Sequence, residues 1–505
     1  MAGFVLSRLL GLGREVAIGY QFGTTRELDA YLAAFRVPDL LFQLVAGGAL
    51  ASAFIPTFTA YLAREDEEGA WHLASAIANI LLILLGSLAL IMACAADPLV
   101  RYVIAPGFEP AAQQITAHLM RWMLLATVIF ALSGLVMGTL NARQHFLLPA
   151  LAPSVYNLSI IGGALFLGPR WGVYGLAWAV VIGAGGHLLV QVPALIREGA
   201  HYSPVLHLHD PGVREVARLM GPRVIGLAAV QINFLVNTIL ASGLAGGRLS
   251  ALNYAWLLML LPQGIFAMAV STAAFPTLSR QAAEDALAKM RDTFNATLRT
   301  ILFLTVPAAV GLIVLRRPLV TLLLQRGAFD TSSTEVVAWT LQFFALGLVA
   351  HAGVEITSRA FYALHNTKTP VLVSLTAMAV NLALSLLLIR PLAQGGLALS
   401  NSIATILEMI VLLALLRPHL GGLMGSRLAR SAAHTSFSAL VMAVVLALWL
   451  RTAWVGALRW QAVSGIAVGG ITYLATSFLT GSPEVRVAQR YLLDFLSKLP
   501  YNKIV

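Results

Sequence analysis

The fold is decided by residues 2–22, AGFVLSRLLGLGREVAIGYQF, which are long enough to cross a bilayer as one helix, since about 20 residues span the hydrocarbon core. Charged side chains interrupt this apolar stretch and the one that follows it. A charge at the bilayer centre costs roughly 2.5–3.5 kcal/mol, so such residues usually face a bundle interior or a water-filled cavity. The segment from Met1 to Gly48 includes six charges of this kind: Arg8, Arg14, Glu15, Asp29, Arg36 and Asp39.

The composition of the whole chain indicates the same environment. Of its 505 residues 59% are hydrophobic and only 11% are charged, whereas soluble domains have about 25% charged residues. Apolar runs near 20 residues that do not alternate favour helices over a transmembrane β-barrel. We therefore predict an all-α polytopic membrane protein.

The formal charge of +11 and the single cysteine narrow the possibilities further. Lysine and arginine sit mostly between apolar runs, which indicates topology signals and contact with anionic headgroups rather than binding to nucleic acid. One cysteine, Cys94, allows neither a disulfide framework nor a cysteine-based metal site. The arginines in the first apolar stretch favour a first helix over a cleavable signal peptide.

Apolar periodicity predicts fourteen transmembrane helices. Their expected spans are 2–22, 28–62, 73–98, 114–141, 148–167, 171–196, 214–244, 249–280, 290–315, 333–364, 370–390, 394–417, 430–451 and 459–480. Loops on the N-terminal side hold about 16 Lys and Arg and the opposite loops about 10, which predicts both termini in the cytoplasm.

An internal repeat organises these helices. The motif AFIPT at 53–57 recurs as AAFPT at 273–277, and GLA at 175–177 recurs at 396–398. Pro149 has a counterpart in Pro370, and the loop at 107–109 has a loose echo at 327–330, all at offsets of 220 or 221. Six helices separate the copies, which predicts two lobes in the same orientation. We expect an N-terminal six-helix lobe, an inter-lobe cytoplasmic linker, a second lobe, an extra helix pair and a cytoplasmic tail at 1–197, 198–213, 214–417, 430–480 and 481–505.

The charges of the first two helices predict a cationic cavity in the first lobe. Arg8, Arg14 and Arg36 are expected to hold an anionic headgroup, because the guanidinium fork donates two hydrogen bonds to phosphate. Asp29 lies seven positions before Arg36 on the same helix face, and Asp39 follows one turn later. Asp29 and Asp39 are expected to orient the arginines as part of the substrate site.

A structural alternative explains the same residues. Asp29 can pair with Arg36 and Glu15 with Arg14, while the remaining side chains snorkel towards the headgroup layer. The two interpretations differ in whether the guanidinium groups line a cavity.

A second set of charges lies in the second lobe. His351, Glu355 and Arg359 follow one another at four-residue spacing, and Glu before Arg at i, i+4 is the favourable order for an ion pair. Glu355 and Arg359 therefore form either a self-neutralised pair or part of a gate or proton-linked element. Glu408 is a candidate protonation or ion site, or a residue that faces a water-filled channel. No Walker, GxSxG, HExxH or CxxC pattern accompanies these residues, so we expect a transporter rather than an enzyme.

Several ordered motifs make the chain resemble the MurJ (MviN) family over nearly its whole length. They are SRLLGLGR at 7–14, FRVPDLL at 35–41, GALASAFIP at 48–56, APGF at 105–108, PALAP at 149–153 with Asn157, MGP at 220–222, RAFYA at 359–363 and TKTP at 367–370.

The resemblance implies a bacterial inner-membrane flippase of the multidrug/oligosaccharidyl-lipid/polysaccharide exporter superfamily. Such proteins move lipid II, the undecaprenyl-pyrophosphate-linked peptidoglycan precursor, from the inner to the outer leaflet. The family fold has fourteen helices, with a last pair that forms a hydrophobic groove for the lipid tail. The family's cavity arginines match Arg8 and Arg14, and its second-helix acid matches Asp29.

The chain departs from the family pattern at four positions where charges are usual: Phe42, Gly47, Trp256 and Leu257. Each lost charged hydrogen bond weakens the hold on a pyrophosphate by roughly 1.5–3 kcal/mol. Arg36 or Arg359 is expected to compensate.

These departures keep three alternatives open: a flippase for another polyprenyl-linked oligosaccharide, an ion-coupled drug antiporter of the same superfamily, and a scaffold without transport activity. The expected partners are a polyprenyl-pyrophosphate-linked glycan and membrane lipids, for a monomer without a cofactor, driven by Na⁺ or the membrane potential.

Overall fold

The computed structural model describes residues 2–43, 48–423, 425–452 and 458–485, and all regular elements in these ranges are helices. The first half contains α1 Ala2–Phe22, α2 Arg26–Leu41, α3 Gly48–Leu62, α4 Glu67–Cys94, α5 Ala96–Leu99, the π-helical turn η2 Val100–Ile104, α6 Pro110–Ala142, α7 Leu147–Gly162, η3 Gly163–Leu167, α8 Gly168–Trp171, α9 Val173–Leu189, α10 Val192–Arg197 and α11 Pro211–Ser242. The second half contains α12 Arg248–Pro262, η4 Gln263–Met268, α13 Ala269–Ala283, α14 Leu287–Val314, α15 Arg316–Leu323, α16 Thr331–Ala363, α17 Lys368–Leu392, α18 Gln394–His419, α19 Gly425–Arg451 and α20 Leu458–Leu479.

Helix ends follow local capping chemistry. The Thr25 side chain accepts a hydrogen bond from the Leu28 amide at the start of α2, and Asp66 does the same for Gly69 in α4. Asp210 accepts from two amides at the start of α11, where proline occupies the first helical position. These side chains satisfy amides that have no partner within the helix, so polar loop residues decide where the apolar helices begin.

Eleven helical segments in the described ranges are long and apolar enough to cross a membrane. Large apolar side chains along them are exposed, such as Ile83 and Leu387, as expected for surfaces that face lipid. The prediction of an all-α polytopic membrane protein is thus confirmed. The predicted spans 2–22 and 214–244 are also helical but lie outside these eleven. The predicted span 28–62 contains most of α2 and all of α3, with residues 44–47 between them not described, and the number of fourteen crossings stays a prediction.

Helix bounds repeat with the spacing of the sequence motifs. The bounds of α16 equal those of α6 shifted by 221 residues, which is one of the two motif offsets. The bounds of α13 equal those of α3 shifted by the same number. The bounds of α14 equal those of α4 shifted by 220 residues, the other motif offset. The first residues of α17 and α18 lie 221 positions after those of α7 and α9. Helix order is therefore duplicated, and so are the lengths in three of these five helix pairs, as expected for two copies of one arrangement.

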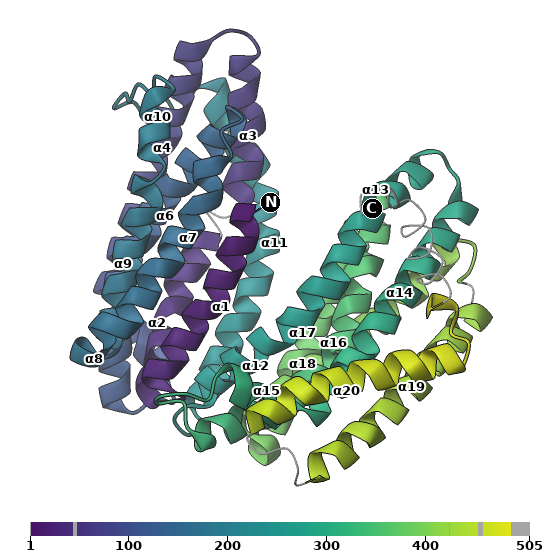
Figure 1. Ribbon diagram of the computed structural model, residues 1–505. Helices are drawn as coiled ribbons and strands as arrows, with labels where there is room; N and C mark the ends of the chain where they lie inside the picture. Colours follow the sequence, from purple (N-terminus) through teal and green to yellow (C-terminus); the bar gives the residue numbers. More distant parts are fainter. Residues whose placement is uncertain (1, 44–47, 424, 453–457, 486–505) are drawn as a thin grey trace, which may run out of the picture. The chain divides into compact units, whose positions relative to one another are not determined.

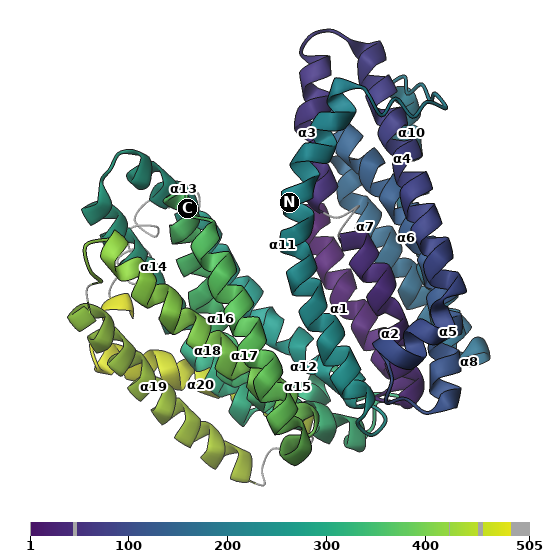
Figure 2. The ribbon, with the colours of Figure 1, turned by 180° about the vertical axis from the view of Figure 1, so that it is seen from behind.

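The chain forms two compact units, Met1–Ser250 with Arg326–Ser333, and Ala251–Gln325 with Thr334–Val505. In the first unit α1 packs against α7, α2 and α9 pack against α6, and α3 packs against α11 (Figures 1 and 2). Its core contains Phe54, Phe58 and Trp71. Because α11 packs here, this unit extends beyond the predicted linker at 198–213; the predicted lobe boundaries stay a prediction.

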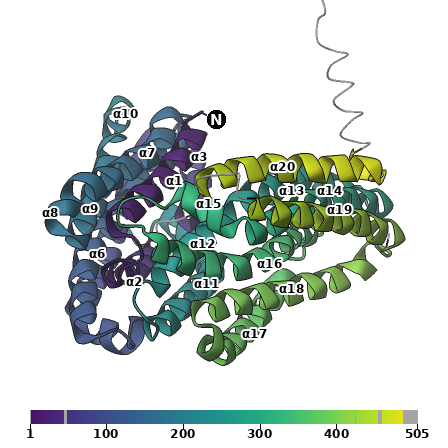
Figure 3. The same ribbon diagram turned by 60° about the horizontal axis from the view of Figure 1, so that its bottom comes forward.

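The second unit has two core clusters. One surrounds Phe294 and Phe361, and the other joins α14 to the last two helices through Phe303 and Tyr473. The Tyr473 hydroxyl donates to the Phe303 carbonyl oxygen at 2.7 Å. α19 and α20, which correspond to the predicted extra pair, lie side by side (Figure 3). Most of the predicted tail 481–505 lies outside the described residues.

Candidate functional site

Arg14 is held in place on α1 by two neighbours. Its Nε donates to Glu15 Oε1 at 3.0 Å, and its Nη1 donates to Asn157 Oδ1 at 3.2 Å. Asn157 on α7 in turn donates to the Ser7 carbonyl oxygen at 3.2 Å. The Arg14 and Glu15 side chains are 29% and 22% exposed. The predicted pairing of these two residues is confirmed, and it leaves part of the guanidinium accessible.

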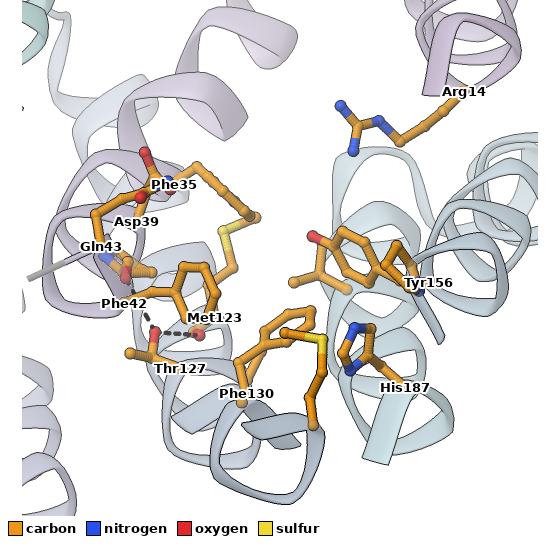
Figure 4. Close-up of a pocket in the computed structure, with 16 residues that line it drawn as sticks. Arg14, Phe35, Asp39, Phe42, Gln43, Met123, Thr127, Phe130, Tyr156 and His187 are labelled. Atoms are coloured by element: carbon orange, nitrogen blue, oxygen red, sulfur yellow. Dashed lines mark hydrogen bonds between the residues drawn. The ribbon is translucent and has the colours of Figure 1, made fainter. Parts of the chain in front are cut away.

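A cavity of about 580 Å³ opens beside Arg14 within the first unit. Two sides face each other in Figure 4: Arg14, Tyr156 and His187 lie on one, and Asp39, Phe42 and Gln43 on the other. The guanidinium and the Tyr156 hydroxyl point into the space between them. The remaining lining residues are Phe35, Pro38, Met123, Ala126, Thr127, Phe130, Gly134, Met137, Pro153 and Val180. The cavity therefore combines a mostly apolar surface with few polar groups, as ligand pockets usually do.

The cavity wall at α9 is fixed by a buried polar network. His187 Nδ1 lies 2.6 Å from Ser133 Oγ, and Gln191 Nε2 donates to that same hydroxyl at 2.9 Å. Gln191 also donates to the His187 carbonyl oxygen at 2.8 Å. Because its ring is held through Nδ1, His187 presents a defined edge to the cavity.

The structure brings only part of the predicted arginine set together. Of Arg8, Arg14 and Arg36, only Arg14 lines the cavity. Arg8 is an exposed residue of α1. The Nε of Arg36 donates to Thr238 Oγ1 on α11 at 2.8 Å, and its guanidinium lies 5.7 Å from the centre of the Phe234 ring. Arg36 therefore connects α2 to α11, while Asp39 is the second predicted residue that reaches the cavity.

Asp29 does not pair with Arg36, which corrects one expectation from the sequence. It is 1% exposed, and its two carboxylate oxygens accept from the amides of Gly247 and Ser250, each at 2.7 Å. These amides lie at the start of α12, where a negative charge stabilises the helix end. The spacing in the sequence placed Asp29 on the correct helix but did not reveal this partner, which is distant in the chain.

Asp29 is part of a larger contact set, the loop cluster, formed by residues 20–29, 105–108, 242–250 and 326–333. Arg26 donates to the Leu244 carbonyl oxygen at 2.9 Å, and the Gly107 amide donates to Ser242 Oγ at 3.0 Å. Further bonds join Ala328 to Tyr20 at 2.8 Å and Thr24 to Ser333 at 2.9 Å.

Glycine is required within this cluster. At Gly247, where φ is +82°, a Cβ atom would overlap the Thr24 carbonyl oxygen. No other residue type fits this approach without moving the backbone. The loop cluster therefore depends on direct backbone packing.

The second unit contains the predicted Glu355–Arg359 ion pair. Nε and Nη2 of Arg359 donate to the same carboxylate oxygen at 3.0 and 2.7 Å, so the pair is confirmed. His351 Nε2 lies 3.1 Å from Asn401 Oδ1, and its ring lies 5.5 Å from that of Trp256. The gating or proton-linked role of these residues stays a prediction.

The remaining predicted positions have separate environments. Glu408 accepts a hydrogen bond from the Ser374 hydroxyl on the neighbouring helix α17. Leu257 is a half-buried residue of α12, and Gly47 lies outside the described residues. Within the described ranges no group of three or more His, Cys, Asp or Glu is positioned to hold a metal ion.

An apolar groove of about 550 Å³ lies within the second unit. It is lined by α12, η4, α14, α15, α16, α19 and α20, with Phe266, Phe303, Ile466 and Tyr473 among its side chains. On α20 the groove is lined in part by Gly465, Gly469 and Gly470, which have no side chains to fill it. Its surface suits a hydrocarbon chain.

Sequence reasoning did not identify several lining residues: Phe130, Gly134, Tyr156 and His187. Their residue types are common in membrane helices, and their positions on three different helices give no joint signal in the chain. Asn157 was visible only as part of a motif.

The family model and the similar sequences name one family. The model of the family "Lipid II flippase MurJ" matches residues 18–462. The probable lipid II flippase MurJ of Bdellovibrio bacteriovorus is 33% identical over 440 residues, which cover 85% of this chain and 83% of that protein. The corresponding protein of Rhizobium tropici is 32% identical over 510 residues, with 96% and 94% covered.

Solved structures match as well. A lipid II flippase MurJ in an inward closed conformation has a TM-score of 0.81 and 26% identity, over 95% of this chain and 98% of that one. An inward-facing multidrug resistance transporter of the MATE family and MOP superfamily has a TM-score of 0.70 at 18% identity, over 82% and 94% of the two chains. The second similarity concerns the fold alone.

Proposed function

Because this chain belongs to the lipid II flippase MurJ family, we propose that it moves undecaprenyl-pyrophosphate-linked disaccharide-peptide from the inner to the outer leaflet by alternating access. The chain is a transporter rather than an enzyme, and a multi-pass protein of the inner membrane. We also propose which residues bind the substrate and which contacts gate the transport cycle.

The observation that carries the proposal is the cavity beside Arg14. A half-buried guanidinium, fixed by Glu15 and Asn157, points into a space of about 580 Å³ within a helical bundle. Away from bulk water, a fixed guanidinium binds a diphosphate through charged, bidentate hydrogen bonds. In the proposal the headgroup enters this cavity with its diphosphate on Arg14.

The prenyl chain has a matching surface in the proposal. The groove along α19 and α20 is lined almost entirely by apolar side chains. A prenyl tail that moves from the bilayer into this groove exchanges one apolar surrounding for another, so packing contacts rather than removal from water favour it there. The cavity holds the polar end of the substrate and the groove its apolar end.

The loop cluster is the proposed outer gate. If both termini are cytoplasmic, the loops at 23–25, 105–108, 243–247 and 326–330 lie on the opposite side of the membrane. Asp29 bonds there to the first amides of α12. Breaking these contacts would free the helix ends that they join, which is the movement that release to the outer leaflet requires.

Asp29→Ala is expected to speed the opening of this gate. The substitution removes two hydrogen bonds to a charged group, each worth roughly 1.5–3 kcal/mol, so opening becomes about a hundredfold more favourable or greater. Ser242→Cys in a Cys94→Ser background provides an isosteric, buried thiol in the cluster, because Cys94 is the only native cysteine. We expect a membrane-impermeant maleimide to label this thiol correspondingly faster in the Asp29→Ala variant.

Glu27→Ala is the matched control, since Glu27 is an exposed acid in the same helical turn. It should leave the labelling rate unchanged. Equal rates for Asp29→Ala and its parent would remove the loop cluster from the mechanism.

Complementation tests the proposed function directly. Expression of this chain should restore growth and cell shape in a bacterium depleted of its own lipid II flippase. Failure to rescue, with normal amounts of protein in the membrane, would favour the alternative of another polyprenyl-linked oligosaccharide, which Phe42, Gly47 and Leu257 at positions of usual charge support.

The orientation and the energy source complete the proposal. Both termini are cytoplasmic in the proposal. A reporter that is active only in the cytoplasm should therefore be active when it is fused after Val505. The cycle is driven by a Na⁺ gradient or by the membrane potential, which supplies about 2.3 kcal/mol per charge per 100 mV. Collapse of each gradient in turn in proteoliposomes identifies the one that transport needs.

A further inference from the structure

Four rings form a continuous aromatic surface in the cavity, which we call the aromatic wall: Phe42, Phe130, Tyr156 and His187. The Phe130 ring lies at the centre of the wall. Its centroid is 5.4 Å from that of Phe42, 4.8 Å from that of Tyr156 and 5.4 Å from that of His187. The rings come from the end of α2 and from α6, α7 and α9, so four helices must pack correctly to form the wall.

The ring faces of the aromatic wall, as distinct from the Tyr156 hydroxyl, are cavity surface that a diphosphate does not use. Arg14 is the one guanidinium among the described lining residues, and it lies at one side of the cavity (Figure 4). Phosphate oxygens bind donors and positive charge, whereas ring faces carry partial negative charge. A different part of the ligand must therefore contact the wall.

The polar groups opposite Arg14 indicate the chemistry of that part. Asp39 and Gln43 line the facing side. A carboxylate repels phosphate but accepts hydrogen bonds from hydroxyl and amide groups, and a primary amide can both donate and accept. The Thr127 hydroxyl lies 3.3 Å from the Pro38 carbonyl oxygen, to which it donates.

A pyranose ring has the complementary surface. Its C–H groups form apolar patches, and their partially positive hydrogens pack on the partially negative faces of aromatic rings. Its hydroxyl and acetamido groups project from the rim. We propose that the aromatic wall binds the saccharide ring next to the diphosphate, with the rim groups bonded to Asp39 and Gln43 and the diphosphate on Arg14. This subsite rests on the proposed function, since it specifies which part of the lipid-linked substrate the cavity reads.

Two lipids that share the undecaprenyl chain and the diphosphate test the proposal: undecaprenyl pyrophosphate, whose terminal phosphate is free, and lipid II, which carries the saccharide-peptide there. Binding of each to the full chain is measured by native mass spectrometry. Phe42→Leu keeps an apolar side chain but removes the ring, and it should weaken lipid II about three- to tenfold. Its affinity for undecaprenyl pyrophosphate should not change. Arg14→Ala should weaken both lipids.

Phe166→Leu is the control, because Phe166 is an exposed ring of η3 that does not line the cavity. It should leave both affinities unchanged. Equal losses for the two lipids in Phe42→Leu would overturn the saccharide subsite alone. A parent protein that binds neither lipid would overturn the proposed function and the subsite together.

Discussion

Arg14→Ala is expected to abolish rescue of a flippase-depleted bacterium. A guanidinium donates two hydrogen bonds to a diphosphate, each worth roughly 1.5–3 kcal/mol when charged. Their loss weakens binding by about a hundredfold or more. Arg14 lines the cavity, and neither Arg8 nor Arg36 does, so no other guanidinium among the described lining residues replaces the lost contact. Growth after depletion and lipid II binding in purified protein are the two measurements.

The partner of Arg14 requires a second variant. Removing the arginine leaves the Glu15 carboxylate half-buried without its ion pair, and breaking a buried pair in this way costs about 3–5 kcal/mol. Arg14→Ala with Glu15→Ala removes both charges and should regain stability but not transport. A double variant that rescues growth would show that the single variant failed through misfolding.

Arg121→Ala is the matched control for charge. Arg121 on α6 pairs with Asp97 at 2.6 Å, is 34% exposed and does not line the cavity. Exposed pairs contribute little to stability. This variant should rescue growth as the parent does, and an equal failure of both variants would separate Arg14 from substrate binding.

Gly134→Leu is expected to block transport by filling the cavity. Gly134 on α6 lines the space of about 580 Å³, so a leucine there would extend from the helix into it. Leucine favours a helix over glycine by up to about 1 kcal/mol, which offsets part of the cost of any crowding. We expect a protein that folds and reaches the membrane but binds neither lipid II nor undecaprenyl pyrophosphate and does not rescue growth.

Gly86→Leu controls for the change of residue type. Gly86 lies on α4, and a Cβ atom there would meet nothing within 4 Å. Its thermal stability and rescue should equal or exceed those of the parent. Full rescue by Gly134→Leu would mean that the substrate does not use this cavity.

The duplicated helices differ at the position of the cavity glycine. At the offset that relates α6 to α16, Gly134 corresponds to Glu355 and Gly138 corresponds to Arg359. These two charged side chains bond to each other in α16. Where α6 has one glycine that lines the cavity and one that packs against Phe54, α16 has an ion pair that neutralises its own charge.

Features that depend on neighbouring residues could be predicted from the sequence. Apolar runs predicted the membrane helices, the i, i+4 spacing predicted the Glu355–Arg359 pair, and adjacency predicted the pairing of Arg14 with Glu15. The constant offset between repeated motifs also predicted the duplication of helix bounds. In each case the partner lies within a turn or two of helix, or the pattern is repeated along the chain, so the information is local.

Only the tertiary structure decided how the charges are used. Arg8, Arg14 and Arg36 look equivalent in the sequence, yet Arg14 reaches the cavity, Arg8 is exposed and Arg36 bonds to Thr238. Asp29 bonds to amides at the start of α12, which are distant from it in the chain. Helical periodicity states which face of a helix is buried, but the packing of distant helices chooses the partner on that face.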